Sequence, residues 1–152
     1  EEKEEQMEKI NELCDQAKEN EESKKVIETF TRKTIRKHND VKEQTKEELS
    51  LWYQGRCQIC KKTFAKRDGK NYFEIHLINK TDKWGGGGLI IPGNALCLCP
   101  WHKAKIEQGR HTERFIPSKI EKLKLNMKIC GKEETIHFKK EHYLFIKAYW
   151  EI

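Results

Sequence analysis

The chain has 152 residues, of which 36% are apolar and 37% are charged. This composition leaves material for one small core, and it excludes a protein organised around membrane spans, because no apolar run approaches ~20 residues. Residues 1–23 carry ten acidic and three basic side chains, so the net charge of +6 hides a balance of −7 there and +13 in the rest. A positive field of that size favours nucleic acid as a partner, although a lysine-rich solvated surface explains the composition equally well.

The first third of the chain predicts three helices. Apolar residues recur at helical spacing over 1–20 and again over 24–38, with a polar break between the two stretches. Asp40 is a suitable N-cap for a third helix that runs to about Tyr53. The apolar positions expected to face inward are Met7, Ile10, Leu13, Cys14, Ala17, Val26, Ile27, Phe30, Ile35, Val41, Leu49 and Trp52.

From residue 55 the helical period stops, and glycine, cysteine and aromatic residues become frequent. "RDGK" at 67–70 predicts a turn between two strands, "KKTF" and "NYFEIHLI", and "GNALCLC" predicts a further short strand. A short helix is expected to begin at Pro100 and to end at Gly109.

The C-terminal stretch predicts a hairpin and a helix. "KLKLNMKIC" alternates apolar and polar residues, Gly131 suits a turn, and "TIHF" alternates again. "EHYLFIKAYW" then has the pattern of an amphipathic helix.

Four residues form two chelating pairs with the spacing of a tetrahedral zinc site. Cys57 and Cys60 form a C-x-x-C knuckle, and Cys99 and His102 form a C-x-x-H pair. Cys97 is a rival ligand, since on a strand it points to the same side as Cys99. A closed site of this kind is structural, and zinc-bound thiolates favour a reducing compartment, so we expect a cytoplasmic protein.

The two remaining cysteines, Cys14 and Cys130, are interpreted as small hydrophobic residues. The chain begins with Glu1 rather than Met, which we interpret as a fragment of something longer.

Three blocks of sequence together resemble a known family. "YQGRCQICKKTF", "YFEIHLI" and "GNALCLCPWHKAKIEQG", within residues 50–110, look like successive parts of the HNH (ββα-metal) endonucleases. The resemblance is to the zinc-stapled bacterial branch, which is found among other places at the end of larger proteins with sacsin-like ATPase or defence domains. We therefore expect an α+β fold with N-terminal helices (1–53), a zinc-bound ββα module (54–110) and a C-terminal β-hairpin plus helix (111–152).

The resemblance implies a catalytic strand on which one residue ligates a divalent metal and the next, a histidine, activates water. Such families read Glu-x-His-His-Ile where this chain reads "EIHLI" from Glu74 to Ile78. Either His76 takes the ligand place and Leu77 the base place, or His76 is the base and an isoleucine stands at the ligand place. Asn94 matches the asparagine that orients the base.

The final helix of the family carries two further metal ligands one turn apart. His102 belongs to the zinc site, and the position of the next ligand holds Lys103, which cannot bind a cation. Glu107 is a possible remnant of the second ligand, and we expect Lys103 to pair with it. Because a general base and a metal ligand are both missing from this site, we expect a module that no longer cleaves nucleic acid. The alternative is a Mg²⁺- or Mn²⁺-dependent nuclease whose metal site uses His111 together with His76 and Glu107.

Three functions remain open from the sequence. The first is binding of nucleic acid, most simply duplex DNA, through basic residues around the ββα unit. The second is assembly with a protein partner or the rest of a longer polypeptide, through the N-terminal helices or the Trp84–Gly88 stretch. The third is the active nuclease. The candidate nucleic-acid contacts are Lys61, Lys62, Lys66, Arg67, Lys70, Lys103, Lys105 and Arg110.

Overall fold

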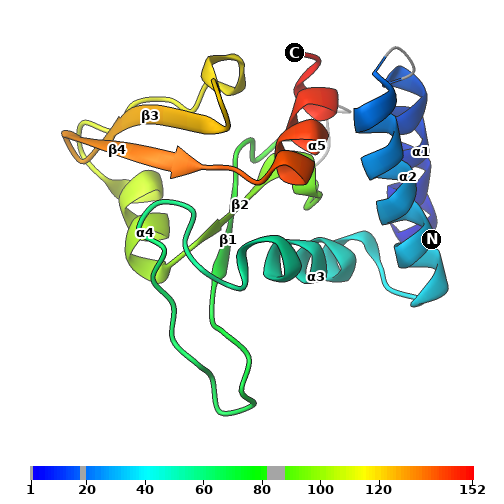
Figure 1. Cartoon of the computed structure of the whole chain (residues 1–152), viewed down its shortest axis with the longest axis horizontal. Helices are drawn as coiled ribbons and strands as arrows, with labels where there is room; N and C mark the ends of the chain where they lie inside the picture. The colour runs from blue at the N-terminus through cyan, green and yellow to red at the C-terminus, as the bar shows by residue number, and fades with distance from the viewer. Residues whose placement is uncertain (1, 18–19, 82–87) are drawn as a thin grey trace.

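The computed structural model describes residues 2–17, 20–81 and 88–152, and it has the predicted α+β class (Figure 1). The α-helices are α1 (Glu2–Gln16), α2 (Glu21–Arg36), α3 (Val41–Tyr53), α4 (Pro100–Gln108) and α5 (Lys140–Trp150). The strands are β1 (Glu74–Leu77), β2 (Ala95–Leu98), β3 (Lys124–Ile129) and β4 (Lys132–His137). Short 3₁₀ turns, η1 and η2, cover Pro92–Asn94 and Pro117–Lys119. None of the helices in these described ranges is long and apolar enough to span a bilayer.

The N-terminal helices bury one apolar face each, as predicted, and pack against α5 at one end of the molecule (Figure 1). α2 begins at Glu21 because the side chain of Asn20 accepts a hydrogen bond from the backbone N–H of Ser23 at 3.1 Å. The prediction for Ile35 is wrong, since its side chain is 61% exposed. Thr34 is buried instead, and the next helical position lies about 100° further round the axis.

α3 links this helical end to the rest of the molecule. Its predicted cap is confirmed: Asp40 and Glu43 form a reciprocal capping box with hydrogen bonds of 2.7 and 2.9 Å. The helix ends at Tyr53, as expected, where Gln54 adopts the left-handed conformation. Val41 and Leu49 face inward, and Trp52 is half-buried.

The predicted hairpin around "RDGK" is only partly formed. The turn exists, with the Lys66 N–H donating to the Lys70 carbonyl at 2.7 Å, but a single bridge joins its arms, between Ala65 and Asn71. "KKTF" is not a strand, because most side chains over 61–70 are exposed and the segment has no apolar face to bury. β1 pairs with β2 instead, in antiparallel register with His76 opposite Leu96.

α4 runs between the predicted boundary residues, with Pro100 in its first turn and Gly109 as its C-cap. It packs against β1 and β2, so these elements form a ββα unit. The C-terminal hairpin is confirmed in full: β3 and β4 pair around Gly131, whose φ of 75° suits the turn. The apolar side of β3 packs into a second core together with Leu96 and Leu98 of β2.

A buried histidine joins α5 to α3 and β2. The Nε2 of His142 lies 2.9 Å from the carbonyl oxygens of both Pro92 and Ala95, so this nitrogen carries the proton and donates. Its Nδ1 therefore accepts from the Tyr53 hydroxyl at 2.5 Å, and that hydroxyl accepts from the Lys139 N–H at 3.0 Å. Burial lowers the pKa of His142 to about 4.

This pKa predicts acid sensitivity. Since the folded pKa lies below the ordinary value of 6.5, the unfolded chain binds the proton more tightly between pH 6.5 and 4. The contribution of neutral His142 to the free energy of unfolding is complete above this window and is lost as the pH falls through it, by roughly 3 kcal/mol. Urea unfolding across this pH range measures it. In His142→Gln, whose amide can form the same hydrogen bonds without titrating, the dependence is expected to flatten; parallel curves for the two proteins contradict the prediction.

Candidate metal centre and the neighbouring cleft

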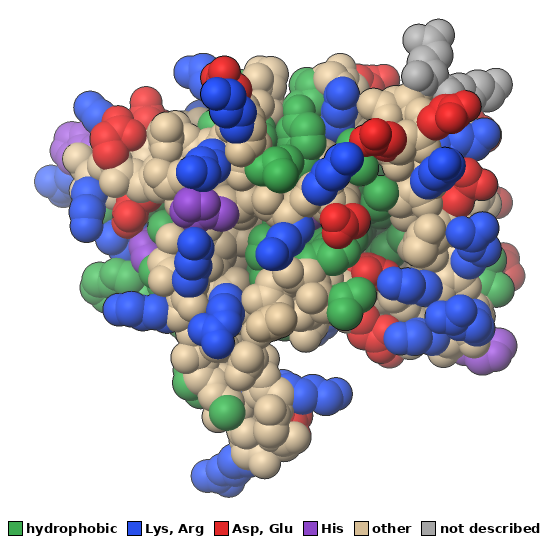
Figure 2. Space-filling view, viewed as in Figure 1, with side chains coloured by type: hydrophobic (Ala, Val, Ile, Leu, Met, Phe, Trp, Pro, Cys, Tyr) green, Lys and Arg blue, Asp and Glu red, His purple; other side chains and the backbone are tan. Residues whose placement is uncertain are grey.

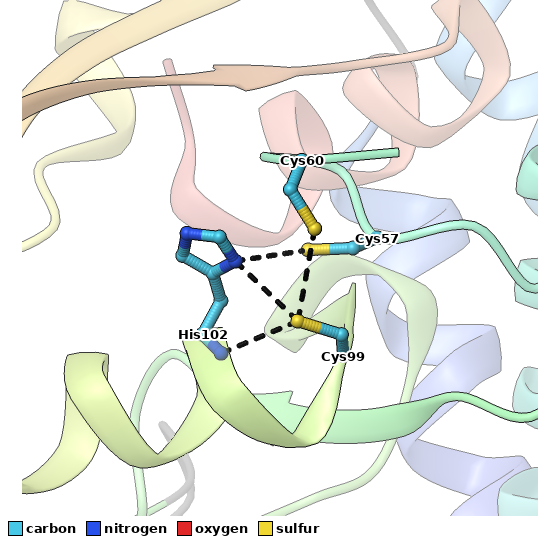
Figure 3. A group of neighbouring side chains, drawn as sticks. All are labelled: Cys57, Cys60, Cys99 and His102. Carbon is cyan, nitrogen blue, oxygen red and sulfur yellow. Dashed lines mark hydrogen bonds between the residues drawn. The ribbon is translucent and has the colours of Figure 1, made fainter. Parts of the chain in front are cut away.

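Two tight turns bring the four predicted zinc ligands together (Figure 3). The Cys57–Cys60 knuckle follows Gly55, whose φ of 71° and close approach to Asn71 leave no room for a side chain. Cys99 is the N-cap of α4, and its sulfur accepts a hydrogen bond from the His102 N–H at 3.3 Å. The Cys57 sulfur accepts one from the Ile59 N–H at 3.4 Å. Each of the two turns therefore supplies a backbone donor to one of the sulfurs.

The spacing of these atoms fits a tetrahedral metal. All four ligand atoms lie within 4.8 Å of one another. The Cys60 and Cys99 sulfurs are 3.8 Å apart, and the His102 Nδ1 lies 3.8 Å from the Cys57 sulfur and 3.4 Å from that of Cys99. Zinc bonds of about 2.3 Å to sulfur and 2.0–2.1 Å to nitrogen give tetrahedral edges of about 3.5–3.8 Å. The cluster can thus hold a metal such as zinc.

Burial raises the pKa of the Cys60 thiol to about 12, so a metal must displace a proton there. Cys97, the rival ligand, lies outside the cluster and is fully buried, with its sulfur 3.5 Å from the carbonyl oxygen of Arg56. Cys130, interpreted from the sequence as a small hydrophobic residue, is exposed where β3 turns into β4. Cys14 is half-buried beside the N-terminal core.

The C-terminal hairpin supplies an outer partner for the cluster that sequence reasoning missed. The Nε2 of His102 lies 3.1 Å from a carboxylate oxygen of Glu134 on β4. Because Nδ1 faces the sulfurs, Nε2 carries the proton and donates to this carboxylate, which fixes the tautomer that a metal ligand needs. Gln58 makes a second link, since its amide bonds to the Cys97 N–H and to the His137 carbonyl. No sequence spacing signals either contact.

We expect Glu134→Ala to weaken zinc affinity by about 10–100-fold, because loss of an outer-shell partner leaves the histidine ligand less well oriented and less basic. Competition with a chromophoric chelator measures the change. Glu133→Ala, an exposed carboxylate one residue away on β4, is the matched control. Equal affinity in the two variants contradicts the role given to Glu134.

A small cleft of about 290 Å³ lies beside this centre, between β1 and α4. His76 reaches across it from β1, with its Nδ1 2.9 Å from the Glu107 carboxylate. The Lys103 ammonium binds the other carboxylate oxygen at 3.0 Å, which confirms the expected pairing. Leu77 also lines the cleft.

The surroundings of His76 and Glu107 explain the directions in which their pKa values shift. Burial lowers the pKa of His76, and Glu107 opposes that effect in part. Burial raises the pKa of Glu107, but hydrogen bonds from His76 and Lys103 outweigh it and hold the pKa below its ordinary value. The carboxylate is therefore already neutralised by a cation of the protein itself.

The side chain of Asn94 is fully buried, and both its amide oxygen and its amide nitrogen are hydrogen-bonded to backbone groups. Its carbonyl oxygen accepts from the Asn79 N–H at 2.9 Å, and its amide nitrogen donates to the carbonyls of Asn79 and Leu89 at 2.9 and 3.0 Å. Asn94 thus links Asn79, which follows β1, to Leu89, which precedes β2. These bonds go to backbone groups and not to His76.

The alternative metal site is not assembled in the structure. Within residues 2–17, 20–81 and 88–152, the Cys₃His cluster is the one group of three or more such ligands close enough to share an ion. His111 is exposed and has a φ of 62°, and it is not among the residues that line the cleft with His76 and Glu107. Of the Trp84–Gly88 stretch named as a possible partner surface, residues 84–87 lie outside the described residues.

The basic residues predicted to contact nucleic acid differ in whether they form ion pairs with acidic side chains. Lys103 pairs with Glu107, and Lys105 lies 3.7 Å from Glu134 and above the Trp101 ring. Lys66 lies 3.6 Å from Asp68. In Figure 2, basic side chains lie on the segment before β1, which projects from the body of the molecule, and on the α4 side of the same face. The candidates that are exposed and make no ion pair with another described residue are Lys61, Lys62, Arg67, Lys70 and Arg110.

Fold and site together define an α+β chain with a ββα unit and a Cys₃His cluster suited to zinc. No protein-family model matches the sequence, and no curated protein matches it either. Among solved structures, the chain is similar to the modification dependent TagI restriction endonuclease, with a TM-score of 0.43 and 19% sequence identity. The alignment covers 67% of this chain and 35% of that protein.

Proposed function

We propose that this chain is a zinc-stabilised HNH-like module that binds nucleic acid and does not cleave it. The observation that carries the proposal is the group formed by His76, Lys103 and Glu107, in which an ammonium occupies the place of a divalent cation. Hydrolysis of a phosphodiester needs an activated water and a neutralised phosphate, and a metal normally supplies both. Here Glu107, the carboxylate that would bind the metal, forms an ion pair with Lys103 instead.

The orientation of His76 supports one of the two alignments left open by the resemblance. Its side chain faces α4, where the family places its other metal ligands, so His76 corresponds to the ligand and Leu77 to the general base. Leucine cannot accept a proton, and the absence of a general base costs about 10²–10⁴ in rate. Asn94, with its amide bound to backbone groups, serves the fold in this proposal.

The charge of the chain supports nucleic acid as the ligand. The part of the chain after residue 23 carries +13, and several exposed cations lie on the segment before β1 and at the end of α4. Lysine and arginine contacts to phosphates release condensed counterions, which gives affinity without sequence specificity. Duplex DNA lying along α4 is the arrangement that the ββα resemblance favours.

The experiment measures binding and cleavage on the same protein. We expect a labelled duplex to bind at low salt, with an affinity that falls steeply as salt rises, and a plasmid to stay intact with Mg²⁺ or Mn²⁺. Changing Lys61, Lys62 and Arg110 together to Glu is expected to weaken duplex binding by about tenfold or more. Lys105 is left unchanged because it lies beside Glu134 and the metal centre.

Two outcomes contradict the proposal. If the duplex does not bind at low salt, or binds equally well at all salt concentrations, the proposal that the chain binds nucleic acid is wrong. If the unmodified protein nicks the plasmid efficiently and His76→Ala abolishes this activity, the proposal that the module is inactive is wrong, and the metal-dependent nuclease is favoured.

A further inference from the structure

A groove of about 1120 Å³ lies between α3 and the segment that precedes β1, on the other side of that segment from the metal centre. We call it the α3 groove. Residues of α2, α3, the 66–75 stretch and α4 line it, and its cations are Lys33, Lys37, Lys46, Lys66, Lys70 and Lys103. The projecting segment that forms one wall stands clear of the body of the molecule in Figures 1 and 2. Most of these lysines belong to no motif in the sequence.

Each acidic side chain of the groove interacts with a lysine or a tyrosine that also lines the groove. Glu48 lies 3.1 Å from Lys33, and Glu47 lies 2.8 Å from Lys37. Glu74 accepts a hydrogen bond from the Tyr72 hydroxyl at 2.5 Å. The lining itself has six lysines and three glutamates, a net charge of +3, but Lys66 and Lys103 pair with Asp68 and Glu107 just outside it. Lys46 and Lys70 are the groove lysines without an ion pair to another described residue, and they favour a negatively charged ligand there.

An aromatic pair extends the wall of the groove, since Tyr72 lines the groove and Phe64 stacks on Tyr72 beyond the lining residues. Phe64 is 58% exposed and stacks on Tyr72, with ring centroids 5.1 Å apart and planes at 18°. Backbone bonds hold the two arms in place, since the Tyr72 N–H donates to the Phe64 carbonyl at 2.9 Å and the Thr63 hydroxyl donates to the Tyr72 carbonyl at 2.8 Å. The pair is preformed, and the Phe64 ring remains more than half exposed.

We propose that the α3 groove binds a single nucleic-acid strand, with phosphates on its lysines and a base stacked on Phe64. Cations that follow a backbone, combined with an aromatic ring for the bases, are how proteins hold unpaired strands. In a duplex the bases stack on one another and cannot reach the ring. The inference rests on the proposed nucleic-acid function and adds a site whose lining does not include Lys61, Lys62 or Arg110.

The test compares two charge-matched variants. Lys37, Lys46 and Lys70 are exposed, and we change all three to Gln; the control changes Lys119, Lys122 and Lys132, exposed residues near or on the C-terminal hairpin, in the same way. Fluorescence anisotropy with labelled oligothymidylate is expected to show about tenfold or more weaker binding for the groove variant than for the control. The slope of log affinity against log salt should fall by about 2, since each phosphate contact on a single strand contributes about 0.7. Binding of a duplex of equal length should change equally in the two variants.

The stacking contact has its own test. Phe64→Leu keeps an apolar side chain and is expected to weaken strand binding by about tenfold, and Phe64→Tyr should retain it, because any aromatic ring can stack on a base. Polyglutamate of equal charge should compete poorly with the oligonucleotide.

Each contrary result has one meaning. Equal strand binding by the groove and control variants, or equal competition by polyglutamate, overturns the inference. If the duplex still binds through Lys61, Lys62 and Arg110, the proposed function survives that failure. If the unmodified protein binds neither strand nor duplex at low salt, both proposals fail together.

Discussion

Chelation of the bound metal is expected to unfold the central part of the protein, from the knuckle at Cys57 through β4. The four ligands come from the turn after α3, the end of β2 and the first turn of α4, so the metal joins three segments of the central core. Structural zinc contributes about 10–16 kcal/mol in zinc-finger peptides, which is as large as the whole net stability of a domain. α1 and α2 pack in another core, which they share with one side of α5, and they are expected to keep much of their helical signal.

Hydrogen exchange with and without a chelator locates the unfolding, and metal analysis of the purified protein gives the stoichiometry, which we expect to be one zinc per chain. The matched pair of variants is Cys99→Ser, which removes a ligand, and Cys97→Ser, which changes a buried thiol outside the cluster. The first should lose the zinc and the second should keep it. A purified protein that holds no zinc and has an unchanged circular dichroism spectrum when chelator is added is incompatible with this prediction.

Replacement of Lys103 by histidine is expected to create a divalent metal site. The change removes the ammonium that binds Glu107 and places an imidazole one helical turn from that carboxylate, which His76 also contacts. Three ligands on two rigid elements then surround one position, and an imidazole–carboxylate set suits transition metals. Calorimetric titration with Mn²⁺ or Co²⁺ should show a site that the unmodified protein lacks. Ala104→His, which adds a histidine on an exposed position of the same helix, should show none.

The double variant Lys103→His with Leu77→His tests catalysis in the same cleft. Leu77 lines it, so a histidine there can act as the missing base, and a base contributes about 10²–10⁴ in rate. We expect metal-dependent nicking of plasmid DNA from the double variant only. Leu77→His alone should stay inactive, because Lys103 still excludes the cation. Activity in that single variant would show that the ammonium does not block the site.

The sequence by itself determined the features that depend on neighbours along the chain. The capping box of Asp40, the turn and alternation of the C-terminal hairpin and the limits of α4 follow from side chains a few residues apart, whose backbone preferences act locally. The metal ligands were also readable, since each chelating pair is local and only two such pairs exist.

Tertiary structure alone decided which distant groups meet. The partner of β1 is β2 rather than "KKTF", because only β2 offers a fully buried strand to pair with. Cys97 and Cys99 have the same alternation on a strand, and their separation came from the N-cap geometry at Cys99, where the chain leaves the strand for α4. The bond from His102 to Glu134, the bonds from Asn94 to Asn79 and the lining of the α3 groove all join residues that are distant in sequence. Such contacts leave no periodic signal, since they depend on how helices and hairpins pack and not on the order of residues within any one of them.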